Sequence, residues 1–167
     1  MAIILVGGGA RSGKSRYALQ LAPQYDSRFV FLATAQPLDK EMEARIAQHR
    51  GERAPEFTTI EEPIEIWKVI RAQNAGAIVV DCLTLWLSNV MLSFGRDVNA
   101  DIESLVEAAQ ASAATVILVT NEVGCGIIPE TTLGRDYRDR CGILNQRMAR
   151  VADEVHWMIF GCPLRVK

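Results

Sequence analysis

The chain carries a full match to the pattern G-x-x-x-x-G-K-S/T, formed by Gly8, Gly9, Ala10, Arg11, Ser12, Gly13, Lys14 and Ser15. An apolar run at residues 3–6 precedes it, and a helical pattern begins within it and continues to about residue 21. Glycines let such a loop bend so that several backbone N–H groups face one point, in front of the positive end of the helix dipole. The pattern therefore predicts a phosphate-binding loop between a strand and a helix. Lys14 is expected to bridge the β- and γ-phosphates of a nucleotide, and the hydroxyl of Ser15 to ligate Mg²⁺.

The rest of the chain alternates short apolar runs with helical patterns. Strands are predicted at residues 29–33, 57–60, 77–80, 116–119, 155–160 and 164–166. Helices are predicted at residues 39–50, 64–73, 83–94, 100–113 and 137–151. A length of 167 residues fits one domain of common size. The sequence therefore predicts a single α/β domain over residues 1–167, P-loop NTPase-like and RecA-like, with a mainly parallel sheet flanked by helices.

Charge and hydropathy exclude several classes of protein. Lys plus Arg number 18 and Asp plus Glu number 20, so the net charge is −2. A near-neutral chain is a poor candidate for broad electrostatic binding, and no nucleic-acid partner is expected. The longest uncharged stretches, residues 82–95 and 108–121, have 14 residues each. Both are too short to cross a bilayer as a helix, so no membrane span is expected.

The cysteines argue against a disulfide framework or a metal cluster. None of Cys82, Cys125, Cys141 and Cys162 forms a C-x-x-C pair, and neither histidine lies near one in sequence. We expect buried free thiols in the reducing environment of the cytoplasm.

Asp81 ends the apolar run at residues 77–80 and is a candidate second Mg²⁺ ligand, because parallel strands end at the edge where the phosphate loop lies. A regulatory GTPase would need D-x-x-G after this strand and an N-K-x-D base-reading motif. The chain instead has Asp-Cys-Leu-Thr at residues 81–84 and Asn-Glu-Val-Gly at residues 121–124. These differences favour phosphoryl or nucleotidyl transfer by a compact enzyme, without naming the acceptor.

His49 lies near the end of the predicted helix at residues 39–50, with Arg45, Arg50 and Arg53 around it. One interpretation is structural, because a histidine stabilises the C-terminal turn of a helix. The other is catalytic, because arginines hold phosphates and keep an imidazole neutral, as a nucleophile requires. His156, in a predicted strand, lacks such surroundings and is expected to be structural.

Two blocks of sequence are more specific than the phosphate loop: Arg-Ile-x-x-His at residues 45–49 and Thr-Asn-Glu-Val-Gly at residues 120–124. With Ala-Thr-Ala-Gln at 33–36 and Asn-Gln-Arg at 145–147, they resemble the bifunctional adenosylcobinamide kinase/adenosylcobinamide-phosphate guanylyltransferase family of cobalamin biosynthesis. The resemblance covers essentially the whole chain. It implies a homotrimer, for which the uncharged segment at residues 83–94 could serve as interface. A buried core helix explains that segment equally well.

The resemblance implies two reactions. ATP or GTP first phosphorylates the aminopropanol hydroxyl of adenosylcobinamide. GTP then donates GMP to a histidine with release of pyrophosphate, and the phosphorylated cobinamide takes up the GMP to give adenosylcobinamide-GDP. The resemblance implies that residues 8–15 hold the triphosphate and that His49 is the guanylylated nucleophile. The further guanine-nucleotide contacts that it implies are Thr34, Ala35, Gln36, Arg50, Gly51, Glu52, Arg53, Glu61 and Asp81.

The chain departs from the family pattern at two of these places. Asp81 stands where family members often have the longer Glu, and Gln48 stands where some have a second histidine, which leaves His49 as the nucleophile. Two alternatives stay open at this point. One is a single-activity kinase for another small alcohol, with His49 structural, and the other is a nucleotide-sensing module without turnover.

Overall fold

The computed structural model describes residues 1–24, 28–37, 39–51 and 55–167, and over these residues seven strands form one sheet in the order β3-β2-β4-β5-β1-β6-β7. The strands are β1 (Ile3–Gly8), β2 (Phe29–Ala33), β3 (Phe57–Glu61), β4 (Ala77–Asp81), β5 (Thr115–Val119), β6 (Glu154–Ile159) and β7 (Cys162–Arg165). Neighbouring strands run parallel except β6 and β7, which form an antiparallel hairpin. The mainly parallel sheet confirms the predicted α/β class.

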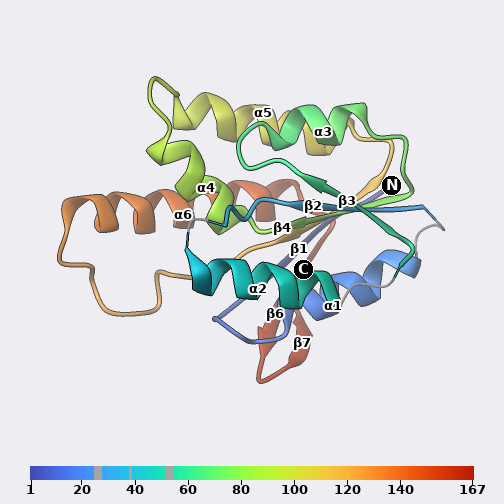
Figure 1. The fold of residues 1–167 in the computed structure, drawn as a ribbon, viewed down its shortest axis with the longest axis horizontal. Helices are drawn as coiled ribbons and strands as arrows, with labels where there is room; N and C mark the ends of the chain where they lie inside the picture. Colours follow the sequence, from blue (N-terminus) through green and yellow to red (C-terminus); the bar gives the residue numbers. More distant parts are fainter. Residues whose placement is uncertain (25–27, 38, 52–54) are drawn as a thin grey trace.

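Helices cover both faces of this sheet. They are α1 (Lys14–Leu21), α2 (Lys40–Gly51), α3 (Ile66–Ala72), α4 (Leu83–Leu92), α5 (Val98–Ala111) and α6 (Thr132–Val151), with a short 3₁₀ turn η1 (Ala22–Gln24) after α1. Figure 1 shows α3 and α5 together on one side of the sheet and α1 on the other. Each helix joins strands that continue in the same direction, which is the connection that a parallel sheet requires.

Strands β1, β2, β4 and β5 are buried on both faces because their side chains alternate between two apolar cores. In β4, Ile78 and Val80 pack with α3 to α6, whereas Ala77 and Val79 pack with α1. The same alternation holds for β1, β2 and β5. This arrangement explains why these segments are continuous apolar runs rather than alternating ones.

Helix caps account for two boundaries that sequence reasoning placed too late. Helix α6 begins at Thr132 rather than at residue 137, because the side chain of Thr131 accepts a hydrogen bond from Gly134 N at 3.1 Å. Helix α5 begins at Val98 rather than at residue 100, because Asp97 caps it.

The final hairpin also turns earlier than predicted. Its two-residue turn is Phe160-Gly161, where both φ angles are positive (49° and 82°), as in a type I′ turn.

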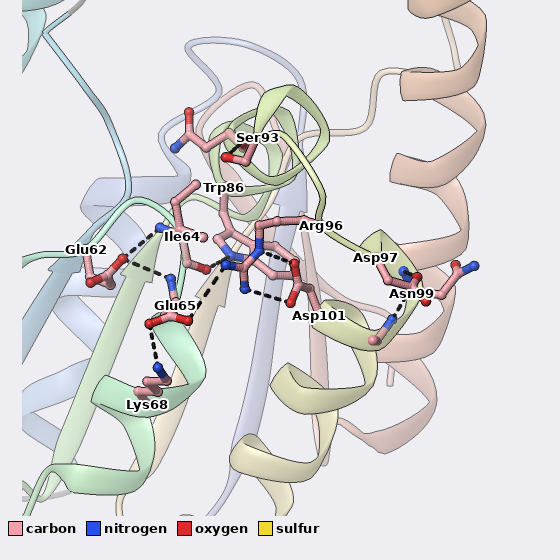
Figure 2. Close-up of polar contacts among 12 residues, drawn as sticks. Glu62, Ile64, Glu65, Lys68, Trp86, Ser93, Arg96, Asp97, Asn99 and Asp101 are labelled. Carbon is pink, nitrogen blue, oxygen red and sulfur yellow. Dashed lines mark hydrogen bonds and ion pairs between the residues drawn. The ribbon is translucent and has the colours of Figure 1, made fainter.

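The connection between α4 and α5 is held by a cluster of polar contacts (Figure 2). Arg96 donates to both carboxylate oxygens of the buried Asp101, at 2.7 and 2.9 Å, and also faces Glu65 of the segment before α3. Its guanidinium lies 5.3 Å from the ring centre of Trp67. Beside this cluster, Asp97 Oδ1 accepts from Asn99 N at 2.9 Å and from Ala100 N at 3.3 Å. The start of α5 is therefore fixed by side chains, not by apolar packing alone.

We expect Asp97→Ala to destabilise the protein by about 1 kcal/mol, because two backbone N–H groups lose their acceptor. For a chain of this size the change corresponds to a fall in Tm of about 2–4 °C. Asp97→Asn is the matched control, because asparagine caps helices as well as aspartate does. Thermal unfolding followed by circular dichroism checks both variants. Equal melting of the alanine variant and the wild type would contradict the assigned cap.

The four cysteines are free, but only two are buried. Burial raises the pKa of Cys82 to about 11 and that of Cys141 to about 12, so both thiols stay protonated near neutral pH. Cys125 lies in the loop after β5 and Cys162 on the edge strand β7, and both are exposed. The prediction that all the thiols are buried is wrong for these two, because neither segment is covered by a helix. None of the described helices is long and apolar enough to cross a membrane.

Candidate nucleotide-binding site

The phosphate loop lies between β1 and α1, as predicted. Gly8 and Gly13 adopt φ angles of 148° and 91°, conformations that favour glycine. The side chain of Lys14 is 6% exposed, and its Nζ donates to Gly9 O and, at 3.4 Å, to Ser12 Oγ. Burial lowers the pKa of Lys14, and the neighbouring Cys82 and Asp81 oppose that shift. The predicted phosphate-binding lysine is therefore close enough to Asp81 for their charges to interact.

Gly8→Ala is expected to weaken nucleotide binding by about tenfold. A Cβ at Gly8 would lie 2.9 Å from Met158 O and 2.9 Å from Ser12 Oγ, so the loop must shift to accept it. Gly142→Ala is the matched control, because Gly142 lies in α6, outside the phosphate loop, and a Cβ there meets nothing within 4 Å. Titration of both variants with a fluorescent nucleotide analogue makes the comparison. If both bind like the wild type, the loop shape at Gly8 does not matter for binding.

The sheet register brings the other predicted contacts to the same edge as the phosphate loop. Glu61, Ala33 and Asp81 are register partners across β3, β2 and β4. The row continues across β5 to Val6 of β1, two residues before Gly8. Residues that are far apart in sequence thus end their strands side by side, which is where parallel α/β sheets bind ligands.

Thr34 follows β2 and is fully buried. Its Oγ1 accepts from Cys82 N and donates to Cys82 O, both at 2.8 Å, and its backbone N donates to Asp81 O at 3.1 Å. The hydroxyl therefore joins the ends of β2 and β4, directly before the half-buried Ala35 and Gln36.

Asn89 is a contributor to this edge that sequence reasoning missed. Its Nδ2 donates to Thr34 O at 2.8 Å and to Pro63 O at 3.1 Å. It thereby joins the segments that follow β2 and β3. The available signal was a single amide in the uncharged and mostly apolar segment that forms α4.

Helix α2 contains the predicted nucleophile, since His49 lies two residues before its end at Gly51. Arg50 of α2 forms an ion pair with Glu61 at the end of β3, so two predicted nucleotide contacts meet. The structure does not describe the side chains of Arg45, Gln48 and His49. The predicted contacts Glu52 and Arg53 lie outside the described residues. The structure thus places the backbone of His49 on the helix that reaches Glu61.

Ser15 and Asp81 are the predicted Mg²⁺ ligands. Both offer oxygen atoms, which Mg²⁺ prefers, and both are half-buried at the edge that holds the phosphate loop. Within the described residues no group of three or more His, Cys, Asp or Glu side chains could hold a metal ion. A site with few protein ligands suits Mg²⁺, which usually keeps several waters and binds through substrate phosphates.

A second network holds the segment after β5 against the phosphate loop. Glu122 N donates to Gly8 O at 3.2 Å, and Asn121 Nδ2 donates to Thr84 Oγ1 at 2.7 Å. Asn145 of α6 accepts from Thr120 Oγ1 at 2.7 Å and donates to Asn121 O at 3.2 Å. These contacts give the Thr-Asn-Glu block and the Asn-Gln-Arg block a shared role in positioning the edge of the sheet. Sequence reasoning identified both blocks but not their contact.

His156 is structural, as predicted. It is buried in β6, where its Nδ1 lies 3.2 Å from Tyr17 Oη and its Nε2 lies 2.9 Å from Glu154 Oε2. Both ring nitrogens are therefore used within the fold, and the imidazole ties β6 to α1.

Comparison with known proteins identifies a family model and curated relatives that match nearly the whole chain. The family model for cobinamide kinase / cobinamide phosphate guanyltransferase matches residues 4–166. The chain is 40% identical to the bifunctional adenosylcobalamin biosynthesis protein CobU of Escherichia coli, covering 99% of both chains. It is also 40% identical to the bifunctional adenosylcobalamin biosynthesis protein CobP of Pseudomonas aeruginosa, covering 98% of this chain and 96% of that protein.

Solved structures support the fold alone. The flagellar accessory protein FlaH from Methanocaldococcus jannaschii matches with a TM-score of 0.55 at 13% identity, covering 99% of this chain and 78% of FlaH. The RadB recombinase matches with a TM-score of 0.52 at 17% identity, covering 93% of this chain and 73% of RadB. These similarities agree with the predicted RecA-like arrangement.

Proposed function

Because this chain belongs to the cobinamide kinase / cobinamide phosphate guanyltransferase family and is an enzyme of adenosylcobalamin biosynthesis, we propose that it performs both reactions around its one phosphate loop. The substrates are adenosylcobinamide and a nucleoside triphosphate, first ATP or GTP as phosphoryl donor and then GTP as GMP donor. Residues 1–167 form the single domain that carries both steps.

In the first step the aminopropanol hydroxyl of adenosylcobinamide attacks the γ-phosphorus of the donor. A new O–P bond forms, the bond to the β–γ bridging oxygen breaks, and the nucleoside diphosphate leaves as the hydroxyl gives up its proton. The backbone of residues 8–15 holds the triphosphate, and Lys14 contacts the β- and γ-phosphates as negative charge moves onto the leaving oxygen. The burial of Lys14 strengthens this interaction because little water competes with it.

In the second step an imidazole nitrogen of His49 attacks the α-phosphorus of GTP, and pyrophosphate leaves from the phosphate loop. A phosphate oxygen of the phosphorylated cobinamide then attacks the same phosphorus and frees His49. Splitting the transfer in this way replaces one difficult displacement by two easier ones. The proposed contacts of the guanine nucleotide are Thr34, Ala35, Gln36, Arg50, Gly51, Glu52, Arg53, Glu61 and Asp81.

Ser15 and Asp81 are the proposed ligands of Mg²⁺, which when bound neutralises the charge of the phosphate oxygens. We also propose that the protein forms a homotrimer, as the family resemblance implies, and that it works in the cytoplasm. Sedimentation analysis in solution tests the trimer.

The observation that carries the proposal is the meeting, at one edge of the sheet, of the phosphate loop with the ends of β2, β3 and β4. A coupled assay tests it. The protein is incubated with adenosylcobinamide, Mg²⁺ and either ATP plus GTP or GTP alone, and the corrinoid products are identified by mass. Adenosylcobinamide phosphate followed by adenosylcobinamide-GDP is expected. The phosphate alone would indicate a single-activity kinase, and GTP binding without any corrinoid product would indicate a sensing module.

A further inference from the structure

A cleft of about 370 Å³ lies beside the phosphate loop, lined by residues 9–12 of the loop and residues 157–161 of the β6–β7 hairpin. Its volume is at the low end of the range of ~300–1,000 Å³ that is typical of small-molecule sites. In the order of the sheet, β6 and β7 lie on one side of β1, whereas β4, β2 and β3 lie on the other. The cleft is therefore on the opposite side of the loop from the proposed guanine-nucleotide contacts at Thr34, Glu61 and Asp81.

The hairpin is packed directly onto the phosphate loop. Gly8 and Met158 are register partners, and a Cβ at Gly8 would lie 2.9 Å from Met158 O. A Cβ at Gly7 would lie 3.3 Å from the ring of Trp157, and one at Gly13 would lie 3.7 Å from Gly161 Cα. The distance between the two walls of the cleft is thus set by the pairing of β1 with β6 and by close packing against these glycines, so a ligand held by the loop meets the hairpin at a fixed place.

Each wall carries a flat side chain. Phe160 is 99% exposed at the tip of the hairpin, and its φ of 49° is one that few non-glycine residues adopt. Arg11 is exposed on the loop, also at a positive φ of 55°. Over the described residues no hydrogen bond or ion pair involves the Arg11 guanidinium. A phenyl ring and a guanidinium both stack on the face of a nucleotide base, and neither depends on which base it is.

We propose that this cleft binds the purine base and ribose of the nucleoside triphosphate that donates the phosphoryl group in the first reaction, with Phe160 and Arg11 against the base. The assignment rests on the proposed function. The triphosphate runs from the cleft along the loop, so its γ-phosphate points toward Lys14 and Asp81. The GTP of the second reaction has its base on the other side of the loop. Both nucleotides need the same phosphate loop, so they exclude one another.

The test compares Phe160→Ala with Phe94→Ala, a matched change at a phenylalanine that is also fully exposed but lies in the α4–α5 connection. Binding of ATP, of GTP and of inorganic tripolyphosphate is titrated by calorimetry in the absence of corrinoid. We expect Phe160→Ala to weaken ATP binding by about tenfold and to leave tripolyphosphate binding unchanged, because only the nucleotides have a base to stack. Phe160→Trp should restore ATP binding, and Phe94→Ala should behave like the wild type.

Unchanged ATP binding in Phe160→Ala would overturn the proposal. Equal weakening of ATP and tripolyphosphate would also overturn it, because that result reports damage to the phosphate loop. In the kinase assay the same variant should raise KM for the donor without a matching fall in kcat. The KM for GTP in formation of the histidine adduct should not change in Phe160→Ala. If that KM rose as much as the KM for the phosphoryl donor, both nucleotides would use one base site, which would contradict the proposal. If the wild type fails to phosphorylate adenosylcobinamide, the proposed function fails, and the titration still decides whether the cleft binds a base.

Discussion

Lys14→Ala is expected to lower kcat/KM for phosphorylation of adenosylcobinamide by at least about 100-fold. Lys14 is buried in the phosphate loop, and its ammonium group bonds to the loop itself, at Gly9 O and Ser12 Oγ. In the reaction this charge faces the oxygen that becomes the leaving group, where a positive charge stabilises the transition state more than the ground state. Most of the effect should therefore appear in kcat.

Lys68→Ala is the matched control, because Lys68 is exposed on α3 and, among the residues that the structure describes, forms an ion pair with Glu65 across one helical turn. Such surface ion pairs contribute little to stability, so Lys68→Ala should keep both activities close to those of the wild type. Circular dichroism establishes that both variants are folded. Kinase activity in Lys14→Ala that matched the control would mean that the triphosphate does not bind at this loop.

His49→Ala is expected to lower GMP transfer by at least about 1,000-fold and to leave the kinase step nearly intact. Without the imidazole the phosphorylated cobinamide has no guanylyl intermediate to attack. The kinase step needs the phosphate loop and Lys14, which lie on α1 and the preceding loop, and not on α2. Adenosylcobinamide phosphate should therefore accumulate when the variant is supplied with ATP and GTP.

His156→Ala is the comparison for this variant. It removes the other histidine, and with it the imidazole that contacts Tyr17 and Glu154, so it should lower thermal stability. At a temperature where it remains folded it should still transfer GMP. A parallel loss of both activities in His49→Ala would contradict a role confined to the second step.

The fold was predictable wherever one physical signal dominated. The runs at Ala77–Asp81 and Thr115–Val119 are apolar at nearly every position because their side chains pack into two cores, and these continuous apolar runs predicted buried strands. Element boundaries that depend on a single residue were harder to predict. The capping oxygens of Asp97 and Thr131 moved the starts of α5 and α6, and the left-handed conformation of Phe160 moved the hairpin turn.

The site was predictable in part. The phosphate loop follows from local sequence, because its glycines and Lys14 act within eight neighbouring residues. The contacts of Asn89 and Asn145 could not be predicted in this way, because their hydrogen bonds join segments that are far apart in the chain. The contact of the hairpin with Gly8 and Gly13 is likewise visible only once β6 is placed beside β1. Residues that bind phosphate can be predicted from a local motif, whereas residues that position the motif can be identified only from the fold.

The most direct test of the central claim, that His49 carries GMP between the two substrates, is covalent labelling of the wild-type protein. The protein is incubated with Mg²⁺ and GTP labelled at the α-phosphate, digested, and the labelled peptide is sequenced by mass spectrometry. We predict a guanylyl adduct that is labile in acid and stable in alkali, attached at His49 and absent from His49→Ala. The absence of an adduct in the wild type, or an adduct on another residue, would contradict the account.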